Sequence, residues 1–121
     1  MKPKVFYLKT CNTSMRILKE LEGLIQDFER IDIKENPVTP EALDQMKKIT
    51  GSYEALFSKR AKKYKEMGLK NMPLTDDDYR YYILQDYTFL KRPVFWLNDK
   101  VFAGNSKKTI EELKQTLSKH D

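Results

Sequence analysis

The stretch VFYLKTCNTS, residues 5–14, decides the fold, because an apolar run passes directly into a short polar turn. Val5 to Leu8 is a continuous run rich in β-forming residues, which is typical of a strand buried on both faces. One of the polar residues that follow, Asn12, Thr13 or Ser14, is expected to cap a helix. That helix is amphipathic, since apolar residues recur at helical spacing: Ile17, Leu18, Leu21, Leu24 and Ile25.

The rest of the chain predicts a second strand, a helical middle, a hairpin and a last helix. Alternating Ile31 and Ile33 indicate the second strand, and Thr39-Pro40 is typical of a helix start. The expected elements are a strand over 28–33, a helix over 40–50 ended by Gly51, a mainly helical segment over 53–67 ended by Gly68, a helix over 75–86, a β-hairpin over 94–102 and a helix from about 106.

This order, β-α-β, a helical block, then β-β-α, is that of a thioredoxin-like fold. We therefore expect an α/β protein with a four-stranded mixed sheet and flanking helices. The two strands of the β-α-β unit should be parallel, because such crossovers are almost always right-handed connections between parallel strands. Residues 1–121 are expected to form a single domain, with a helical insertion at about 39–86.

Composition narrows the class of protein. The 121 residues carry a net charge of +5 and one cysteine, so no disulfide can form within the chain. A lone thiol is typical of a reducing compartment, and no stretch is long and apolar enough for a signal peptide or a membrane span. We expect a cytoplasmic monomer with no membrane partner. No residues have metal-ligand spacing, and His120 should be a frayed end.

The run Lys59-Arg60-Ala61-Lys62-Lys63-Tyr64-Lys65 is strongly basic. Most runs of this kind are solvated helix faces, and no nucleic-acid motif accompanies this one. No direct nucleic-acid partner is therefore expected.

Cys11 is the candidate catalytic residue. At the start of a helix, unpaired N–H groups and the helix dipole favour a thiolate over a thiol, which lowers the cysteine pKa. The same groups can hold an oxyanion. The alternative is a small buried hydrophobe, but the polar neighbours Asn12, Thr13 and Ser14 argue against an apolar packing site.

Arg92 and Pro93 are the second set of candidate site residues. Proline cannot donate a hydrogen bond to a sheet, so Pro93 is expected at the entrance of the strand that begins at Val94. In thioredoxin-like folds a cis proline stands at this place and faces the thiol, so Arg92 should point into the Cys11 pocket. A guanidinium suits oxyanions and carboxylates. The alternative is a solvated arginine.

Together these segments resemble the arsenate reductase family, the ArsC/Spx group of thioredoxin-fold proteins. The resemblance runs over nearly the whole chain, and its specific parts are the cysteine turn and the Arg-Pro segment. It is carried by Cys11-Asn12-Thr13-Ser14, Glu35-Asn36-Pro37, Pro40-Glu41-Ala42-Leu43, Ala55-Leu56-Phe57-Ser58-Lys59-Arg60 with Tyr64, Gly68-Leu69 and Phe89-Leu90-Lys91-Arg92-Pro93-Val94.

For the reductases of this family, the resemblance implies that a cysteine thiolate attacks arsenate, glutathione resolves the adduct, and glutaredoxin completes the reduction. Cys11 and Arg92 match the family's residues. Ser58 stands where a further arginine is expected, followed by Lys59 and Arg60, and Gly104 stands near the place of another. The sequence therefore leaves arsenate reduction itself open, since an anion site needs preorganised donors.

Two functions follow from the resemblance. The first is a single-cysteine thiol oxidoreductase with no bound cofactor, with glutathione as co-substrate and glutathione or glutaredoxin as partner. The second is an Spx-like regulator that binds the C-terminal domain of the RNA polymerase α-subunit, where Gly51 would lie at the contact. Many proteins of the Spx branch carry a Cys-x-x-Cys redox switch. Ser14 stands at the place of its second cysteine here, so no intramolecular disulfide can form. We favour the oxidoreductase.

Overall fold

The computed structural model describes residues 2–119; His120 lies outside the described residues. Its strands form one four-stranded sheet in the order β2-β1-β3-β4, with β1 parallel to β2 and antiparallel to β3. The expected mixed sheet of a thioredoxin-like fold is therefore confirmed. The elements are β1 (Lys4–Tyr7), α1 (Asn12–Glu20), β2 (Glu29–Asp32), α2 (Pro40–Thr50), α3 (Lys62–Glu66), α4 (Asp76–Gln85), β3 (Val94–Leu97), β4 (Lys100–Ala103) and α5 (Lys107–Ser118).

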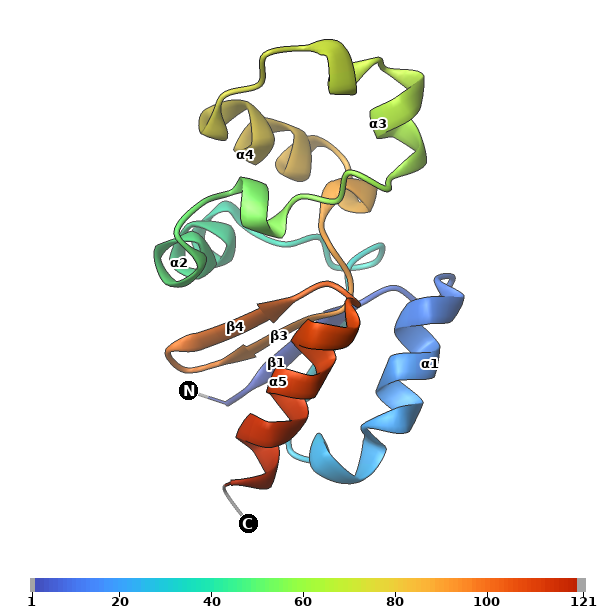
Figure 1. Cartoon of the computed structure of the whole chain (residues 1–121), viewed down its shortest axis with the longest axis vertical. Helices are drawn as coiled ribbons and strands as arrows, with labels where there is room; N and C mark the ends of the chain where they lie inside the picture. The colour runs from blue at the N-terminus through green and yellow to red at the C-terminus, as the bar shows by residue number, and fades with distance from the viewer. Residues whose placement is uncertain (1, 120–121) are drawn as a thin grey trace.

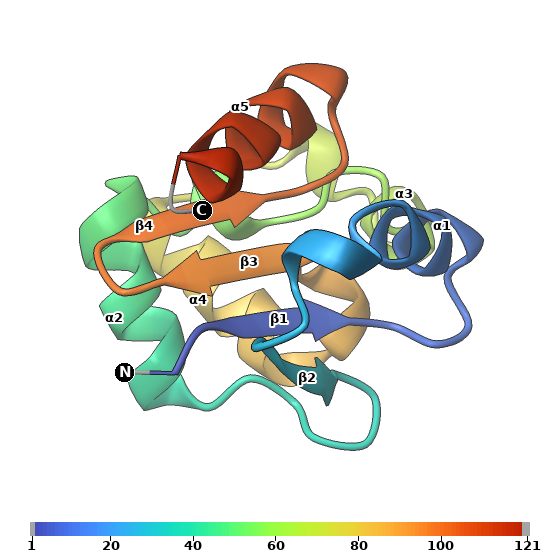
Figure 2. The same ribbon diagram turned by 90° about the horizontal axis from the view of Figure 1, so that it is seen from below.

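Helices cover both faces of the sheet (Figures 1 and 2). Successive residues of a strand point to opposite faces, so Val5 and its partner Phe95 pack beneath α1 and α5. Phe6 and its partner Val94 face the other way, into a second core shared with the helical block between β2 and β3. The central strands are thus buried on both sides, as their continuous apolar runs predict.

The start of α1 differs from the expectation that Asn12, Thr13 or Ser14 caps it. Cys11 is itself the N-cap residue, and its side chain accepts no capping hydrogen bond. The reason is a tight turn after β1, in which the Cys11 N–H donates to the Leu8 carbonyl at 3.0 Å and starts the helix one residue earlier. The first N–H groups of α1 are therefore left without a side-chain cap.

The helical block begins and ends largely where its turn residues predict. The Thr39 hydroxyl accepts from the Ala42 N–H, and Gly51 closes α2 in the left-handed conformation at φ 93°. Thr75 and Asp78 form a reciprocal capping box at the start of α4.

Between α2 and α4 the mainly helical segment expected over 53–67 is wrong in part. Only the short 3-10 turn Glu54–Leu56 and the five-residue α3 are helical. Phe57 is extended and forms an isolated bridge with Leu90. This pairing with a distant segment satisfies backbone groups that a continuous helix would have bonded locally.

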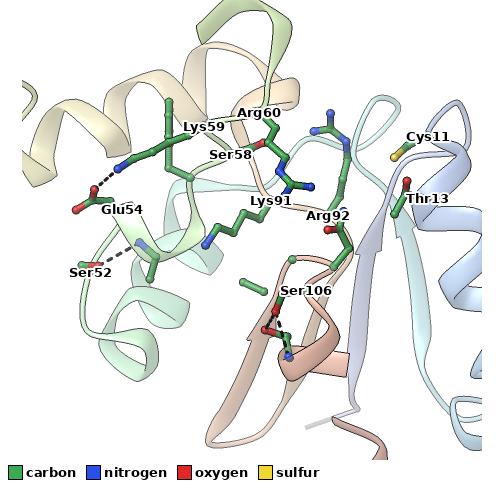
Figure 3. Close-up of a pocket in the computed structure, with 16 residues that line it drawn as sticks. Cys11, Thr13, Ser52, Glu54, Ser58, Lys59, Arg60, Lys91, Arg92 and Ser106 are labelled. Atoms are coloured by element: carbon green, nitrogen blue, oxygen red, sulfur yellow. Dashed lines mark hydrogen bonds and ion pairs between the residues drawn. The ribbon is translucent and has the colours of Figure 1, made fainter. Parts of the chain in front are cut away.

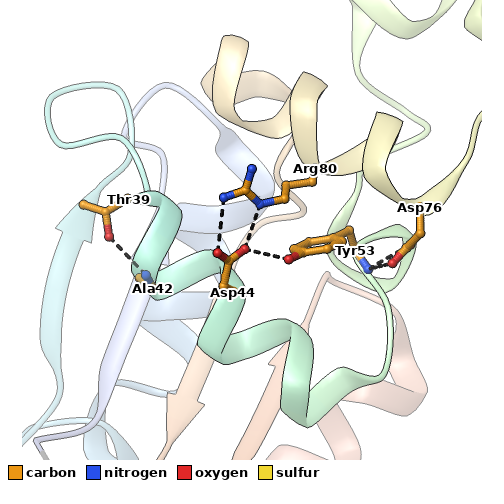
Figure 4. Close-up of polar contacts among 6 residues, drawn as sticks. All are labelled: Thr39, Ala42, Asp44, Tyr53, Asp76 and Arg80. Carbon is orange, nitrogen blue, oxygen red and sulfur yellow. Dashed lines mark hydrogen bonds and ion pairs between the residues drawn. The ribbon is translucent and has the colours of Figure 1, made fainter.

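A polar network joins α2 to α4 (Figure 4). The Asp44 carboxylate accepts from the Tyr53 hydroxyl at 2.6 Å and from Nε of Arg80 at 2.8 Å. The Arg80 guanidinium, followed by the Tyr53 hydroxyl, lowers the pKa of Asp44 to about 2. The Asp76 carboxylate accepts from the backbone N–H of Tyr53 at 3.0 Å and thereby holds the segment after α2 against α4.

β3 and β4 form the predicted hairpin, with Asn98 at positive φ in its turn. Ser106 caps α5 by accepting from the Thr109 N–H at 3.1 Å. No helix within residues 2–119 has the length and apolar character needed to cross a membrane.

Candidate active site

Cys11 lies at the junction of β1 and α1, with an extended backbone at φ −97° and ψ 109°. Its carbonyl accepts the N–H of Met15, the first hydrogen bond of the helix. Its thiol is half-buried, so reagents can reach it. The side chain thus stands at the end of the helix where backbone N–H groups have no carbonyl partner.

The surroundings of Cys11 favour the thiolate. Partial burial raises the pKa of the thiol, but several donors outweigh this effect and the net shift is downward. The backbone N–H and the hydroxyl of Ser14 contribute first, followed by hydrogen bonding and positive charge from Arg92. A lower pKa increases the fraction of the nucleophilic form at neutral pH.

Ser14 lies beneath the thiol and is completely buried. Within the described part of the chain, its hydroxyl makes no hydrogen bond of ordinary geometry. Buried hydroxyls normally have such a partner. This hydroxyl lies close to the cysteine sulfur and lowers the pKa of Cys11.

Arg92 is held by the backbone on the opposite side of the thiol. Its Nη1 donates to the carbonyls of Thr88 at 2.9 Å and Leu90 at 3.1 Å. Its Nε is buried and finds no partner among residues 2–119. The Arg92–Pro93 peptide bond is cis, and Pro93 is buried directly before β3, the strand beside β1. One amino group of Arg92 is therefore anchored and Nε is enclosed, which leaves Nη2 as the exposed nitrogen that can donate to an anion.

Cys11 and Arg92 line a cleft of about 740 Å³ (Figure 3). Cys11 and Thr13 lie on its α1 side, and the segment from Ser58 to Arg60 lies across from them, with Arg92 between. A volume of this size is typical of small-molecule sites and exceeds what a tetrahedral oxyanion fills. The lining residues are Cys11, Thr13, Ser52, Glu54, Ala55, Phe57, Ser58, Lys59, Arg60, Lys91, Arg92, Ala103, Gly104, Asn105, Ser106 and Thr109.

Most of the residues singled out in the sequence meet here, but not all of them. Ser14 and Pro93 are buried and do not line the cleft, although each is close in sequence to a residue that does. Asn12 is exposed and does not line the cleft either. Asn12 begins α1 on its exposed side, whereas Ser14, two residues further along the helix, is buried.

A short backbone ladder brings the segment Ser58–Arg60 to Arg92. The Ser58 N–H donates to the Phe89 carbonyl at 2.7 Å, and the Lys91 N–H donates to the Leu56 carbonyl at 2.8 Å. The extended Phe57 that breaks the expected helix is thus the residue that builds this side of the cleft. Local sequence patterns carry no signal for a pairing over this distance.

Lys91 and the start of α5 are functional candidates that sequence reasoning missed. Lys91 lines the cleft beside the predicted Arg92. Asn105 and Ser106 line it from the segment that leads into α5, and Thr109 lines it from the first turn of α5. The sequence signal for Lys91 is that it forms a basic pair with Arg92 directly before Pro93. A strand entrance at the thiol would place both side chains near the site.

The cleft carries an excess of positive charge. Lys59, Arg60, Lys91 and Arg92 line it, and Glu54 is the one carboxylate among the described lining residues. Glu54 is already paired with Lys59 at 2.6 Å. Burial, followed by the nearby Lys59 ammonium, lowers the pKa of Lys91, and Glu54 partly offsets this effect. The site therefore suits an anionic ligand.

Among residues 2–119, no cluster of three or more His, Cys, Asp and Glu side chains could hold a metal ion. The described residues of the cleft offer a thiol of lowered pKa, hydrogen-bond donors and cations.

Several solved structures are similar to this chain. A possible arsenate reductase from Streptococcus mutans is 24% identical, with a TM-score of 0.76, over 93% of this chain and 98% of that one. An arsenate reductase from Vibrio cholerae is 20% identical, with a TM-score of 0.75, over 95% and 97%. A Staphylococcus aureus protein solved by NMR is 28% identical, with a TM-score of 0.74, over 91% and 96%. No curated protein sequence matches significantly.

The model of the ArsC family matches residues 6–113, which include both the cysteine turn and the Arg-Pro segment. The structural neighbours share the sheet and helices that position these two segments. This chain belongs to the ArsC family.

Proposed function

We propose that this protein is a monothiol oxidoreductase in which the Cys11 thiolate forms a mixed disulfide with glutathione. The observation that carries the proposal is a half-buried sulfur, with lowered pKa, at the start of α1, facing a basic cleft. A thiolate with adjacent donors is the activated form of a cysteine nucleophile.

The first step is thiol–disulfide exchange. The Cys11 thiolate attacks one sulfur of glutathione disulfide, the S–S bond breaks, and one glutathione leaves as a thiolate with the bonding electron pair. A new S–S bond joins Cys11 to the other glutathione. The leaving thiolate departs into a cleft where Arg92 can stabilise its charge.

The second step needs a thiol from outside, because the chain has a single cysteine. Glutathione or glutaredoxin attacks the mixed disulfide, forms a new disulfide with the bound glutathione and releases Cys11 as a thiolate. With an oxyanion as substrate, Arg92 and the N–H groups of α1 are the donors that would hold it.

The alkylation rate of Cys11 as a function of pH tests the activated thiol. With one cysteine in the chain, every alkylated molecule reports on this residue. We expect a midpoint below about 8.5, the value of a free cysteine. A midpoint at or above that value would refute an activated nucleophile, and Cys11→Ser provides the unreactive control.

Mass spectrometry after incubation with glutathione disulfide tests the mixed disulfide. We expect one glutathione on Cys11, removed by added glutathione or glutaredoxin. A parallel sample with reduced glutathione and arsenate tests whether an adduct depends on arsenate, which would extend the activity to arsenate reduction. No adduct from either mixture would contradict the proposed function.

The regulator alternative gains no support from Gly51. Its positive φ and exposure are those of an ordinary helix cap, with no described atom near the place of a Cβ. The oxidoreductase is therefore the function that the site supports best.

A further inference from the structure

We propose that Lys91 is the specificity residue of the cleft and binds a carboxylate on the arm of a thiol or disulfide substrate whose sulfur reacts at Cys11. This inference rests on the proposed function, because it concerns the ligand of the same cleft. It assigns Lys91 a role separate from that of Arg92, which faces the thiol.

The position of the Lys91 side chain is set by the fold. Its N–H is bonded to the Leu56 carbonyl at 2.8 Å, which fixes where the side chain leaves the backbone. Its aliphatic stem lies over Gly104, where an added Cβ would be 3.4 Å from Cδ of Lys91. Gly104 has a positive φ of 97° and bonds to the Pro93 carbonyl at 2.9 Å, so it cannot easily move aside.

The ammonium of Lys91 points along the cleft, away from Cys11 and toward the Ser52 end (Figure 3). No hydrogen bond or ion pair from this ammonium to any of residues 2–119 is present, in contrast to Lys59, which is paired with Glu54. A half-buried cation without an anion is unfavourable in the free protein. A bound carboxylate would supply the missing partner.

The ligand must therefore be elongated. Its sulfur has to reach Cys11 at one part of the cleft while its anionic group meets Lys91 at another, and a volume of about 740 Å³ accommodates both. A tetrahedral oxyanion fills only part of this volume, whereas an elongated ligand can extend along it. A short peptide or amino-acid thiol with a free carboxylate has the required chemistry.

Matched disulfide probes test this assignment. Glutathione disulfide is compared with the same compound carrying esterified carboxylates, and the rate of mixed-disulfide formation at Cys11 is measured by mass spectrometry. We expect wild-type protein to prefer the free carboxylates, and Lys91→Gln to reduce that preference about three- to tenfold, as expected for a partly solvated charge pair. Lys91→Arg should retain most of it.

Lys107→Gln is the matched control, because Lys107 is an exposed lysine next to the lining residue Ser106 but outside the cleft lining. It removes the same charge, so a general electrostatic effect would lower the preference equally in both variants. An equal loss of the preference in Lys107→Gln and Lys91→Gln would overturn the proposal. So would an unchanged preference in a Lys91→Gln protein whose circular dichroism spectrum shows that it is folded.

A ligand that cannot react separates this inference from the proposed function. Binding of S-methylglutathione to the Cys11→Ser protein is followed by NMR, with and without Lys91→Gln. Weaker binding on loss of Lys91 supports the carboxylate site even if Cys11 proves unreactive. If S-methylglutathione binds equally well with and without Lys91→Gln, or binds to neither protein, the carboxylate site is overturned. This holds even if Cys11 of the wild-type protein reacts with both the free and the esterified disulfide.

Discussion

At the scale of single residues, the pKa of Cys11 is lowered at a helix N-cap that makes no side-chain capping hydrogen bond. A serine or aspartate at this N-cap would accept the first N–H groups of α1. A cysteine leaves them free to stabilise its own thiolate, and the polar groups of Ser14 and Arg92 add to the effect. The residue that starts the helix therefore also carries the thiol whose pKa the helix start lowers.

Ser14→Ala tests the contribution of the buried hydroxyl. We expect the pKa of Cys11 to rise toward its ordinary value, because the hydroxyl is lost while the Ser14 N–H remains. Stability should change little, since the hydroxyl has no ordinary hydrogen bond to lose within the described chain. The pH midpoint of alkylation measures the first effect and thermal unfolding the second.

Thr10→Ala serves as the control for this experiment. Thr10 is exposed and adjacent to Cys11 but does not line the cleft. An equal shift of the alkylation midpoint in both variants would assign the effect to the turn as a whole and not to the Ser14 hydroxyl.

At the scale of elements, the ends of the helices are set by local chemistry. Thr39, Thr75 and Ser106 each cap a helix with a hydroxyl, and Gly51 closes α2 at positive φ. These helix ends can be predicted from the sequence, because each residue pairs with a backbone N–H or carbonyl only a few positions away.

Gly51→Ala should destabilise the protein by about 1–2 kcal/mol, the cost of the left-handed conformation for an L-residue with a Cβ. Space is not the cause, because no described atom lies within 4 Å of the added Cβ. Gly23→Ala is the matched control, since it also has open space but no positive φ, and it should have little effect. Urea unfolding measures both; equal losses would contradict the conformational explanation.

At the scale of the whole molecule, the helical block forms one wall of the cleft and the sheet with α1 forms the other. The block is held together by its core around Phe57, whose ring stacks on Phe89 and meets Tyr79 edge-on. The network around Asp44 adds a link between α2 and α4. The geometry of the site therefore depends on contacts between segments distant in the chain.

The Asp44 network predicts a dependence of stability on pH. The pKa of this carboxyl falls from 3.8 to about 2 on folding, so its contribution is present above the unfolded value and is lost as pH falls toward 2. Asp44→Asn should lower the melting temperature at neutral pH and remove this part of the acid dependence. The contribution is modest and salt-sensitive because the pair is solvent-accessible.

Thermal unfolding of both proteins between pH 2 and pH 7 checks the prediction about Asp44. The two curves should converge toward the acid end. A constant difference in melting temperature across the whole range would show that the substitution acts through packing and not through the charge of Asp44.

The sequence by itself determined the order of the elements, the caps of α2, α4 and α5, and the place of Cys11 between a buried strand and a helix. These features depend on residues within a few positions of one another, so hydrophobic spacing and turn chemistry reveal them. The tertiary structure decided that Phe57 pairs with Leu90 and that Lys91 enters the cleft above Gly104. Such features require backbone pairing and packing between remote segments, which no local pattern of residue types encodes.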